Sequence, residues 1–209
     1  MTARKVAEDD RGYHHGDLRN ALVAAAVELI EEQGLDAVSV RALARRLGVS
    51  PGAPFRHFTS RTALLTAVAV EAQDRLLEVV ADARRHAPAG DPLAVFRTIG
   101  EGFLRWAFSN PTHFQVVSTR AVIDYDDPAL RQRNDALRAD MLQLMQAAAA
   151  QGCLRPGDVG QLVLGARALV YGLARMHIDG QFASWGVDSD GALRESMKVL
   201  DQYMASLRA

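Results

Sequence analysis

Residues 38–61 read VSVRALARRLGVSPGAPFRHFTSR, and this segment decides the fold. Its first half carries apolar side chains at Val40, Leu43, Ala44 and Leu47, the spacing of a short helix with one buried side. The residues just before and after that run, Ser39 and Gly48, are typical helix start and stop residues. Ser50-Pro51 then offers a second helix start. A helix, a tight turn and a second short helix form the helix-turn-helix pattern.

The same segment is rich in arginine and lacks acidic residues. No Asp or Glu lies between Ala37 and Val70, whereas five arginines do. Such a cluster favours a polyanionic partner, because neutralised phosphates release their counterions. The alternative is an ordinary αα-hairpin with a solvated basic face, and the pattern alone does not separate the two. The arginines are Arg41, Arg45, Arg46, Arg56 and Arg61.

The segment also resembles the DNA-binding signature of the tetracycline-repressor (TetR) family. The resemblance rests on Gly48-Val49-Ser50-Pro51-Gly52-Ala53, on Phe55-Arg56-His57-Phe58, and on Ser60-Arg61 with Leu64. It extends upstream over residues 29–34 and 39–47, and covers about the first third of the chain. The resemblance implies that the chain binds double-stranded DNA.

Three residues of the signature are unusual. The family usually has Tyr where Phe55 stands, and Phe55 has no hydroxyl for a phosphate contact. The usual Lys is Arg61, which keeps the charge and adds a fork suited to phosphate. Pro54 has no backbone N–H, so we expect the second helix to be short.

The resemblance assigns roles to individual side chains. Gly52, Ala53 and Arg56 are expected to face base edges, with Arg56 reaching guanine through both ends of its fork. Phosphates are expected at Ser39, Ser50, His57 and Arg61, helped by helix N-termini. The full predicted DNA-binding set is Ser39, Arg41, Ser50, Gly52, Ala53, Phe55, Arg56, His57 and Arg61.

The rest of the chain predicts helices only. Its longer segments have helical periodicity, and none alternates convincingly at period two. We expect a first helix capped by Asp17 and ended by Gly34, and breaks at residues 86–92 and 110–111. The prediction is an all-α fold: an N-terminal three-helix helix-turn-helix unit, residues 13–60, and a C-terminal helical-bundle domain, residues 61–209, for ligand sensing and dimerisation.

Composition narrows the class of protein further. Hydrophobic residues make up 49% of the 209 and charged residues 23%, which is ordinary for a globular protein. The single cysteine, Cys153, excludes an internal disulfide. No apolar run is long enough for a transmembrane helix or a signal peptide, so we expect no membrane partner and a cytoplasmic location. Arg4, Lys5 and Arg11 form either a DNA-contacting arm or an idle tail.

The last two predicted helices suggest a homodimer. Residues 159–178 are apolar nearly all round, which requires cover on more than one side. Residues 193–207 place apolar side chains at alternating steps of four and three, the seam of a coiled coil. An internal bundle core is the alternative, but the terminal helices of the TetR family form its dimer interface. The predicted interface is Val163, Val170, Leu193, Met197, Leu200 and Met204.

Aromatic and methionine side chains of the C-terminal helices predict a cavity for a small-molecule effector, with plain core packing as an equal alternative. Arg167 stands in an apolar run and needs a partner if buried. That partner is a carboxylate such as Asp201, an acidic ligand, or a second subunit, and we favour the structural ion pair. The predicted pocket is Phe103, Trp106, Phe114, Met141, Met145, Arg167 and Tyr171.

Enzyme chemistry is not expected. Gly48 to Gly52 matches the Gly-x-Ser-x-Gly nucleophile elbow, but that motif needs a strand before Ser50. No histidine has Glu or Asp three residues before it, and no phosphate-binding loop is present. We therefore predict no catalytic residue, metal or cofactor.

The function predicted is a ligand-responsive transcriptional regulator, most simply a repressor that binds a palindromic operator as a homodimer. A helical-bundle module that binds small molecules or proteins without touching DNA is the main alternative, and a hydrolase using Ser50 a weaker one.

Overall fold

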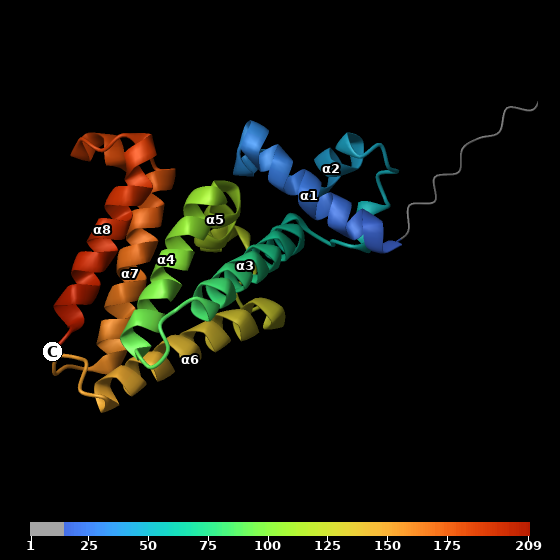
Figure 1. Cartoon of the computed structure of the whole chain (residues 1–209). Helices are drawn as coiled ribbons and strands as arrows, with labels where there is room; N and C mark the ends of the chain where they lie inside the picture. The colour runs from blue at the N-terminus through green and yellow to red at the C-terminus, as the bar shows by residue number, and fades with distance from the viewer. Residues whose placement is uncertain (1–14) are drawn as a thin grey trace, which may run out of the picture. The chain divides into compact units, whose positions relative to one another are not determined.

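The computed structural model of the chain describes residues 15–209 (Figure 1). Over these residues the elements are eight α-helices and four short 3₁₀ turns, with no strand. The predicted all-α class is therefore confirmed. The chain divides into two compact units, one ending at Leu64 and the other running from Leu65 to Ala209. The described residues do not include four positions named above: Arg4, Lys5, Arg11 and residue 13, the predicted start of the first domain.

The first unit contains α1 (His15–Gln33), the 3₁₀ turn η1 (Leu35–Ala37), α2 (Val40–Arg46) and the 3₁₀ turn η2 (Pro54–Arg56). Its small core consists of the apolar faces of α1 and α2 together with Phe58, and includes Leu22, Leu43 and Leu64. Helix α1 ends where predicted, because Gly34 has a φ of +83° and its N–H bonds to the Ile30 carbonyl at 2.8 Å. Its start differs from the prediction: Asp17 lies inside the helix rather than before it.

Helix α2 has the expected ends. The Ser39 hydroxyl accepts a hydrogen bond from the Ala42 N–H at 3.1 Å, which satisfies one of the free donors of the first turn. After the helix, Gly48 has a φ of +65°, a left-handed conformation that glycine adopts without a steric penalty. The predicted cap and stop are both confirmed.

The second element of the motif is shorter than an α-helix. Residues 51–53 form a turn and Pro54–Arg56 a single 3₁₀ turn. Because Pro54 has no N–H, it cannot donate to a preceding carbonyl, whereas its own carbonyl accepts from His57 at 3.0 Å and Phe58 at 2.9 Å. The prediction of a short recognition element is confirmed. The expected Ser50 cap is corrected, because Ser50 bonds to Ala53 through its carbonyl oxygen rather than its hydroxyl.

The second unit is a helical bundle. Helix α3 (Arg61–Arg85) is followed by α4 (Pro92–Ser109), α5 (Pro111–Ser118), α6 (Pro128–Ala150), α7 (Val159–Ile178) and α8 (Ser189–Leu207). The 3₁₀ turns η3 (Arg120–Val122) and η4 (Gln181–Trp185) complete it. Helix α4 is central, since it packs against α6, α7 and α8 (Figure 1).

An aspartate stands at the N-terminal cap of each of four long helices of the bundle. Asp91, Asp127, Asp158 and Asp188 each accept hydrogen bonds from backbone N–H groups in the first turn of α4, α6, α7 and α8. Pro92 and Pro128 also occupy the first helical position, where their missing N–H costs nothing. The break at residues 86–91 therefore has a local chemical cause, and Pro111 begins α5 in the same way after residue 110.

The apolar seam of α8 is used inside the chain. Leu200 is 1% exposed and Met204 5% exposed, because α8 lays this face against α4 and α7. On α7, Val163 and Val170 are also buried in the core. The prediction that these four side chains form a dimer interface is corrected accordingly. They lie in the internal bundle core, the alternative that periodicity alone left open. Leu193 and Met197 remain partly exposed.

Candidate DNA-binding surface and ligand pocket

The five arginines of residues 41–61 divide into two groups, and the first group is exposed. Arg41 and Arg45 are four residues apart on α2, so they lie on one side of it. Arg56 ends the 3₁₀ turn η2 and is also exposed. Within residues 15–209 none of these three guanidinium groups makes an ion pair. Their charge is therefore available to a partner with phosphates.

The second group already has partners in the chain. Arg46 donates to Glu32 at 2.6 and 2.7 Å and to Glu28 at 3.1 Å, and this bonding to Arg46 lowers the pKa of Glu32. Arg61 donates from Nε to the Val38 carbonyl at 3.0 Å and from a terminal nitrogen to the Leu35 carbonyl at 2.8 Å. Arg61 thus holds the loop before α2, and only its remaining donors are available for the predicted phosphate contact.

The other predicted DNA contacts surround the turn between α2 and α3. Ser39, Ser50 and Gly52 are exposed, and Phe55 is 41% exposed although it is a large apolar residue. Ala53 and His57 are half-buried. The Ser39 hydroxyl accepts the cap bond but still has a proton to donate. The structure thus brings the nine predicted residues to one short region of the first unit, 39–61.

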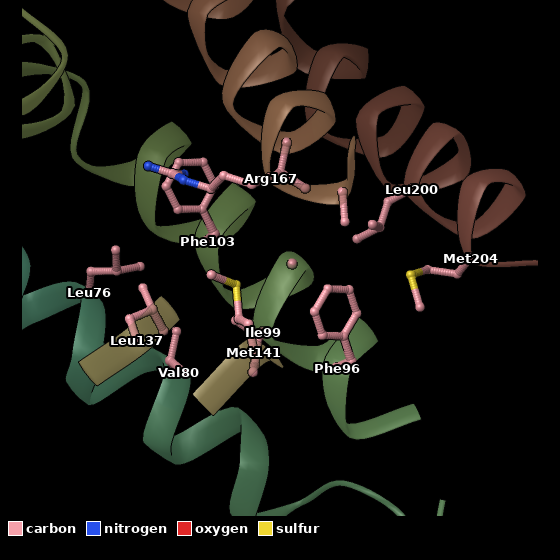
Figure 2. Close-up of a pocket in the computed structure, with 13 residues that line it drawn as sticks. Leu76, Val80, Phe96, Ile99, Phe103, Leu137, Met141, Arg167, Leu200 and Met204 are labelled. Carbon is pink, nitrogen blue, oxygen red and sulfur yellow. The ribbon is translucent and has the colours of Figure 1, made fainter. Parts of the chain in front are cut away.

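Six of the seven predicted pocket residues line hollows in the second unit. Phe103, Trp106, Phe114 and Tyr171 line a partly polar hollow of about 200 Å³, together with Arg167. Met141 and Phe103 line an adjoining apolar hollow, which Arg167 also borders (Figure 2). Met145 is corrected: it is completely buried in the core and borders neither hollow.

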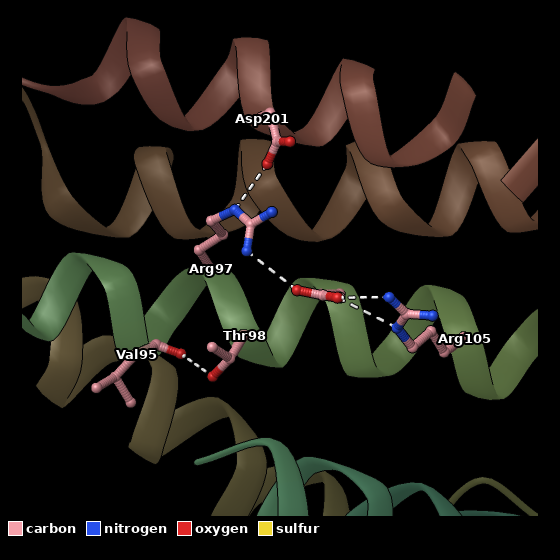
Figure 3. A network of polar contacts seen from close by, with 6 residues as sticks. Val95, Arg97, Thr98, Arg105 and Asp201 are labelled. Carbon is pink, nitrogen blue, oxygen red and sulfur yellow. Dashed lines mark hydrogen bonds and ion pairs between the residues drawn. The ribbon is translucent and has the colours of Figure 1, made fainter. Parts of the chain in front are cut away.

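The predicted ion pair of Arg167 with Asp201 is not formed. Asp201 accepts a hydrogen bond from Arg97 Nε at 2.6 Å, and Arg97 also bonds to Glu101 at 3.0 Å (Figure 3). The Arg167 guanidinium lies instead over the Phe103 ring, 4.7 Å from its centroid, and 5.4 Å from that of Tyr171. These are cation–π distances. The sequence could not reveal this, because periodicity does not specify which helix faces which.

The pocket contains residues that sequence patterns did not single out. Gln73, Arg120 and Tyr125 line its polar part, and Arg120 stacks on Tyr125 with 3.8 Å between its guanidinium carbon and the ring centroid. The apolar part adds side chains from α3, α4 and α6, which look in the sequence like any buried helical positions. They are Leu76, Val80, Phe96, Ile99 and Leu137.

Two comparisons with protein-family models identify both units. Residues 22–68 match the model described as "Bacterial regulatory proteins, tetR family". Residues 96–200, half of the chain, match "Tetracyclin repressor-like, C-terminal domain". The chain belongs to the TetR family. The family inferred from the helix-turn-helix signature is therefore confirmed.

Similar proteins agree with this assignment. The HTH-type transcriptional regulator Rv1816 of Mycobacterium tuberculosis is 33% identical over 130 residues, which cover 58% of this chain and 54% of that protein. The tetracycline repressor class A of transposon 1721 from Escherichia coli is 44% identical over 50 residues, or 24% of this chain and 23% of that one. This TetR chain spans about half the length of the first of these relatives.

Solved structures show the same fold. A protein of unknown function from Rhodococcus sp. RHA1 superposes with a TM-score of 0.77 at 27% identity, covering 96% of this chain and 100% of that one. A regulatory protein of the tetR family from Rhodococcus RHA1 gives 0.70 at 18% identity, covering 90% and 96%.

The TetR assignment also explains the elbow-like motif. Ser50 follows helix α2 in a turn of the first unit, not a strand, so it lacks the setting that a nucleophile elbow needs. Among residues 15–209, no three His, Cys, Asp or Glu side chains are grouped as a metal would require. No helix in that range is both long and apolar enough to cross a membrane.

Proposed function

We propose that this chain is a ligand-responsive repressor, which binds a palindromic operator as a homodimer and leaves it when a small molecule occupies the bundle. Residues 13–60 would bind DNA, and residues 61–209 would dimerise and bind the effector. The observation that carries the DNA-binding part is the exposed set of Arg41, Arg45 and Arg56 around the turn at Gly48, which makes no ion pair within residues 15–209.

The operator should be palindromic because a two-fold dimer presents two identical DNA-binding units. Its half-sites would lie one or two helical turns apart. An exposed apolar side chain supports an interface on α7, since Leu164 is 68% exposed there. On α8, Val199 is 39% exposed and Met197 partly so. These residues replace the four buried ones in the proposed interface.

Release of the chain from its operator would act through α3. This helix supplies Leu76 and Val80 to the apolar hollow, while its first residue, Arg61, holds the loop before α2. A ligand that binds better when α3 is displaced shifts the population toward the displaced state. The coupling between DNA and effector must then be reciprocal, so operator DNA weakens effector binding as much as effector weakens DNA binding.

The test is salt-dependent binding to promoter fragments taken from around the chain's own gene, measured by fluorescence anisotropy. Affinity should fall steeply with salt, and Arg56→Ala should reduce the preference among fragments by about tenfold or more. Arg85→Ala is the matched control, because Arg85 is an exposed arginine of the second unit, paired with Asp82. An affinity that does not respond to salt, or an unchanged preference in Arg56→Ala, overturns the proposal.

The dimeric, palindromic part has its own test. Inserting about five base pairs between the half-sites turns them to opposite faces of the duplex and should abolish cooperative binding. Repression is separated from activation by transcription in vitro from the bound promoter. An increase in transcript on adding the protein would contradict a repressor.

A further inference from the structure

Arg167 carries a charge that no carboxylate of residues 15–209 balances. The side chain is half-buried on α7, and over residues 15–209 its guanidinium makes no hydrogen bond or ion pair, only the two aromatic contacts. Burial lowers the pKa of this guanidinium, yet an arginine stays protonated in proteins. A desolvated cation is costly without an anion beside it.

The acidic side chains near Arg167 are occupied elsewhere. Asp126 and Asp135 border the cleft that Arg167 also lines, but each faces an arginine of its own. The Asp126 carboxylate lies 3.8 Å from Arg131, and that of Asp135 lies 3.0 Å from Arg138. Asp201 is held by Arg97 (Figure 3). The missing anion must therefore come from outside the described chain.

The hollow of about 200 Å³ beside Arg167 has unused hydrogen-bonding groups. Trp106 lines it and is only 2% exposed, and its indole Nε1–H has no partner in the described structure. Gln73 also lines it. Its Nε2 donates to Asn134 Oδ1 at 3.1 Å, but no donor among residues 15–209 reaches the buried Gln73 Oε1. Buried polar atoms of this kind are normally satisfied, so they point to a ligand or to water.

The other side of Arg167 is almost entirely apolar and has little unfilled space. The hollow there has an unfilled volume of about 30 Å³, room for a water or two. Met141 and Met204 project into it (Figure 2). Methionine is unbranched and adapts its shape, so this wall yields to an inserted apolar chain more readily than a wall of branched residues. Arg167 thus lies where a polar compartment meets an expandable apolar one.

We propose that the effector is an amphipathic monocarboxylate. Its carboxylate lies against the Arg167 fork and accepts from the Trp106 indole, and its apolar chain enters between α3, α4, α6, α7 and α8 past Met141. This inference rests on the proposed function, because it assigns a ligand class to the effector site.

Charge and shape select this class. The planar guanidinium matches a carboxylate through two parallel hydrogen bonds. Arg120 also lines the hollow but is exposed, so Arg167 is the cation that burial desolvates. One desolvated cation balances one negative charge, whereas a phosphate monoester would bring close to two. A neutral amphiphile of the same length would fill the apolar hollow but leave Arg167 unpaired.

The experiment compares octanoate, 1-octanol and octyl phosphate, titrated into the full chain by calorimetry without DNA. Octanoate should bind about tenfold to a hundredfold more tightly than 1-octanol, the range of a hydrogen bond to a charged group. In Arg167→Met the two should bind equally well. Arg175→Met on the same helix is the control, because Arg175 is paired with Asp179 at 2.9 Å, and it should keep the preference.

Each outcome decides the proposal. Equal affinities of octanoate and 1-octanol in the natural sequence overturn it, and that comparison needs no variant. Tighter binding of octyl phosphate than of octanoate also overturns it. Should Arg167→Met fail to fold, Arg167→Lys keeps the charge and should retain a reduced preference. Octanoate binding that fails to release operator DNA refutes the proposed function but leaves this site standing.

Discussion

Arg97 on α4 donates a hydrogen bond from Nε to Oδ1 of Asp201 on α8 at 2.6 Å. The pair is partly solvated, with 37% of the Arg97 side chain and 51% of the Asp201 side chain exposed. Arg97 also bonds to Glu101, so it keeps one carboxylate if the other is removed (Figure 3). The pair therefore links α4 and α8 but contributes little to the stability of the fold. Because Asp201 is bound to Arg97, it does not pair with Arg167.

Asp201→Asn should accordingly change stability little. Exposed ion pairs contribute about 0–1 kcal/mol, and the effect on the free energy of unfolding should stay in that range. Urea denaturation measures it. Octanoate affinity should be unchanged, since Asp201 does not balance Arg167; a clear drop in affinity would show that the two residues are coupled after all. Glu195→Gln on the same helix is a matched control, because Glu195 also pairs with a surface cation, Lys198.

Two adjacent arginines should differ in DNA binding. Arg45 is unpaired in the described structure, whereas Arg46 is held by Glu28 and Glu32. Arg45→Ala should lower the slope of log affinity against log salt by about one, the loss of one phosphate contact. Arg46→Ala should leave that slope unchanged. An equal loss of slope in both variants would mean that DNA displaces the two glutamates from Arg46.

Two glycines should give opposite results. Gly48 has a φ of +65°, so Gly48→Ala should destabilise the chain by about 1–2 kcal/mol through left-handed strain, although a methyl group there would have open space. Gly52 has no such φ and also faces open space, so Gly52→Ala should leave stability nearly unchanged. It should instead weaken operator binding, because the methyl group would keep the turn from approaching base edges closely. Thermal denaturation and anisotropy measure the two effects separately.

The helix boundaries were predictable because their signals are local. Gly34 and Gly48 end helices through positive φ, and Pro92 and Pro128 begin them, so short sequence patterns determine these positions. The candidate DNA-binding residues could be named for the same reason: the signature is contiguous, and the structure keeps it in one unit.

The ligand pocket and the role of the apolar seam of α8 were harder to predict, because both depend on contacts between segments that are distant in sequence. Periodicity identifies the apolar face of α8 but not whether α4 of the same chain or a second copy covers it. Likewise, the sequence showed that Arg167 needs a partner, but Asp201 was the wrong one because Arg97, 104 residues away in sequence, holds it. Gln73 and Tyr125 gave no signal, since only the packing of distant segments brings them to the hollow that Trp106 and Arg167 line.

Buried and exposed leucines of the last helices should separate folding from assembly. Leu200→Ala should destabilise the chain by about 2–5 kcal/mol, as for other fully buried leucines. Leu164→Ser should change stability by less than about 0.5 kcal/mol, because Leu164 is 68% exposed. It should instead weaken the proposed dimer, which sedimentation over a concentration series detects. Unchanged association in Leu164→Ser would place the interface away from this part of α7.

Stability should depend on pH through His177. This side chain stacks on Phe108, with ring centroids 4.0 Å apart and planes at 13°, and burial lowers the pKa of His177 below its ordinary value of 6.5. The unfolded chain therefore takes up a proton near pH 6.5 while the folded chain does not, so the free energy of unfolding should fall as the pH is lowered through that value.

Replacing His177 with a residue that does not titrate should remove this contribution. The free energy of unfolding of His177→Phe, relative to the natural sequence, should rise steadily as the pH is lowered from 7.5 to 5.5 in urea denaturation. His177→Gln should show the same rise even if its stability at pH 7.5 differs, because both substitutions remove the same proton-binding group. Parallel pH profiles for the natural sequence and both variants would mean that His177 binds its proton equally well in the folded chain, in contradiction to its half-buried position against Phe108.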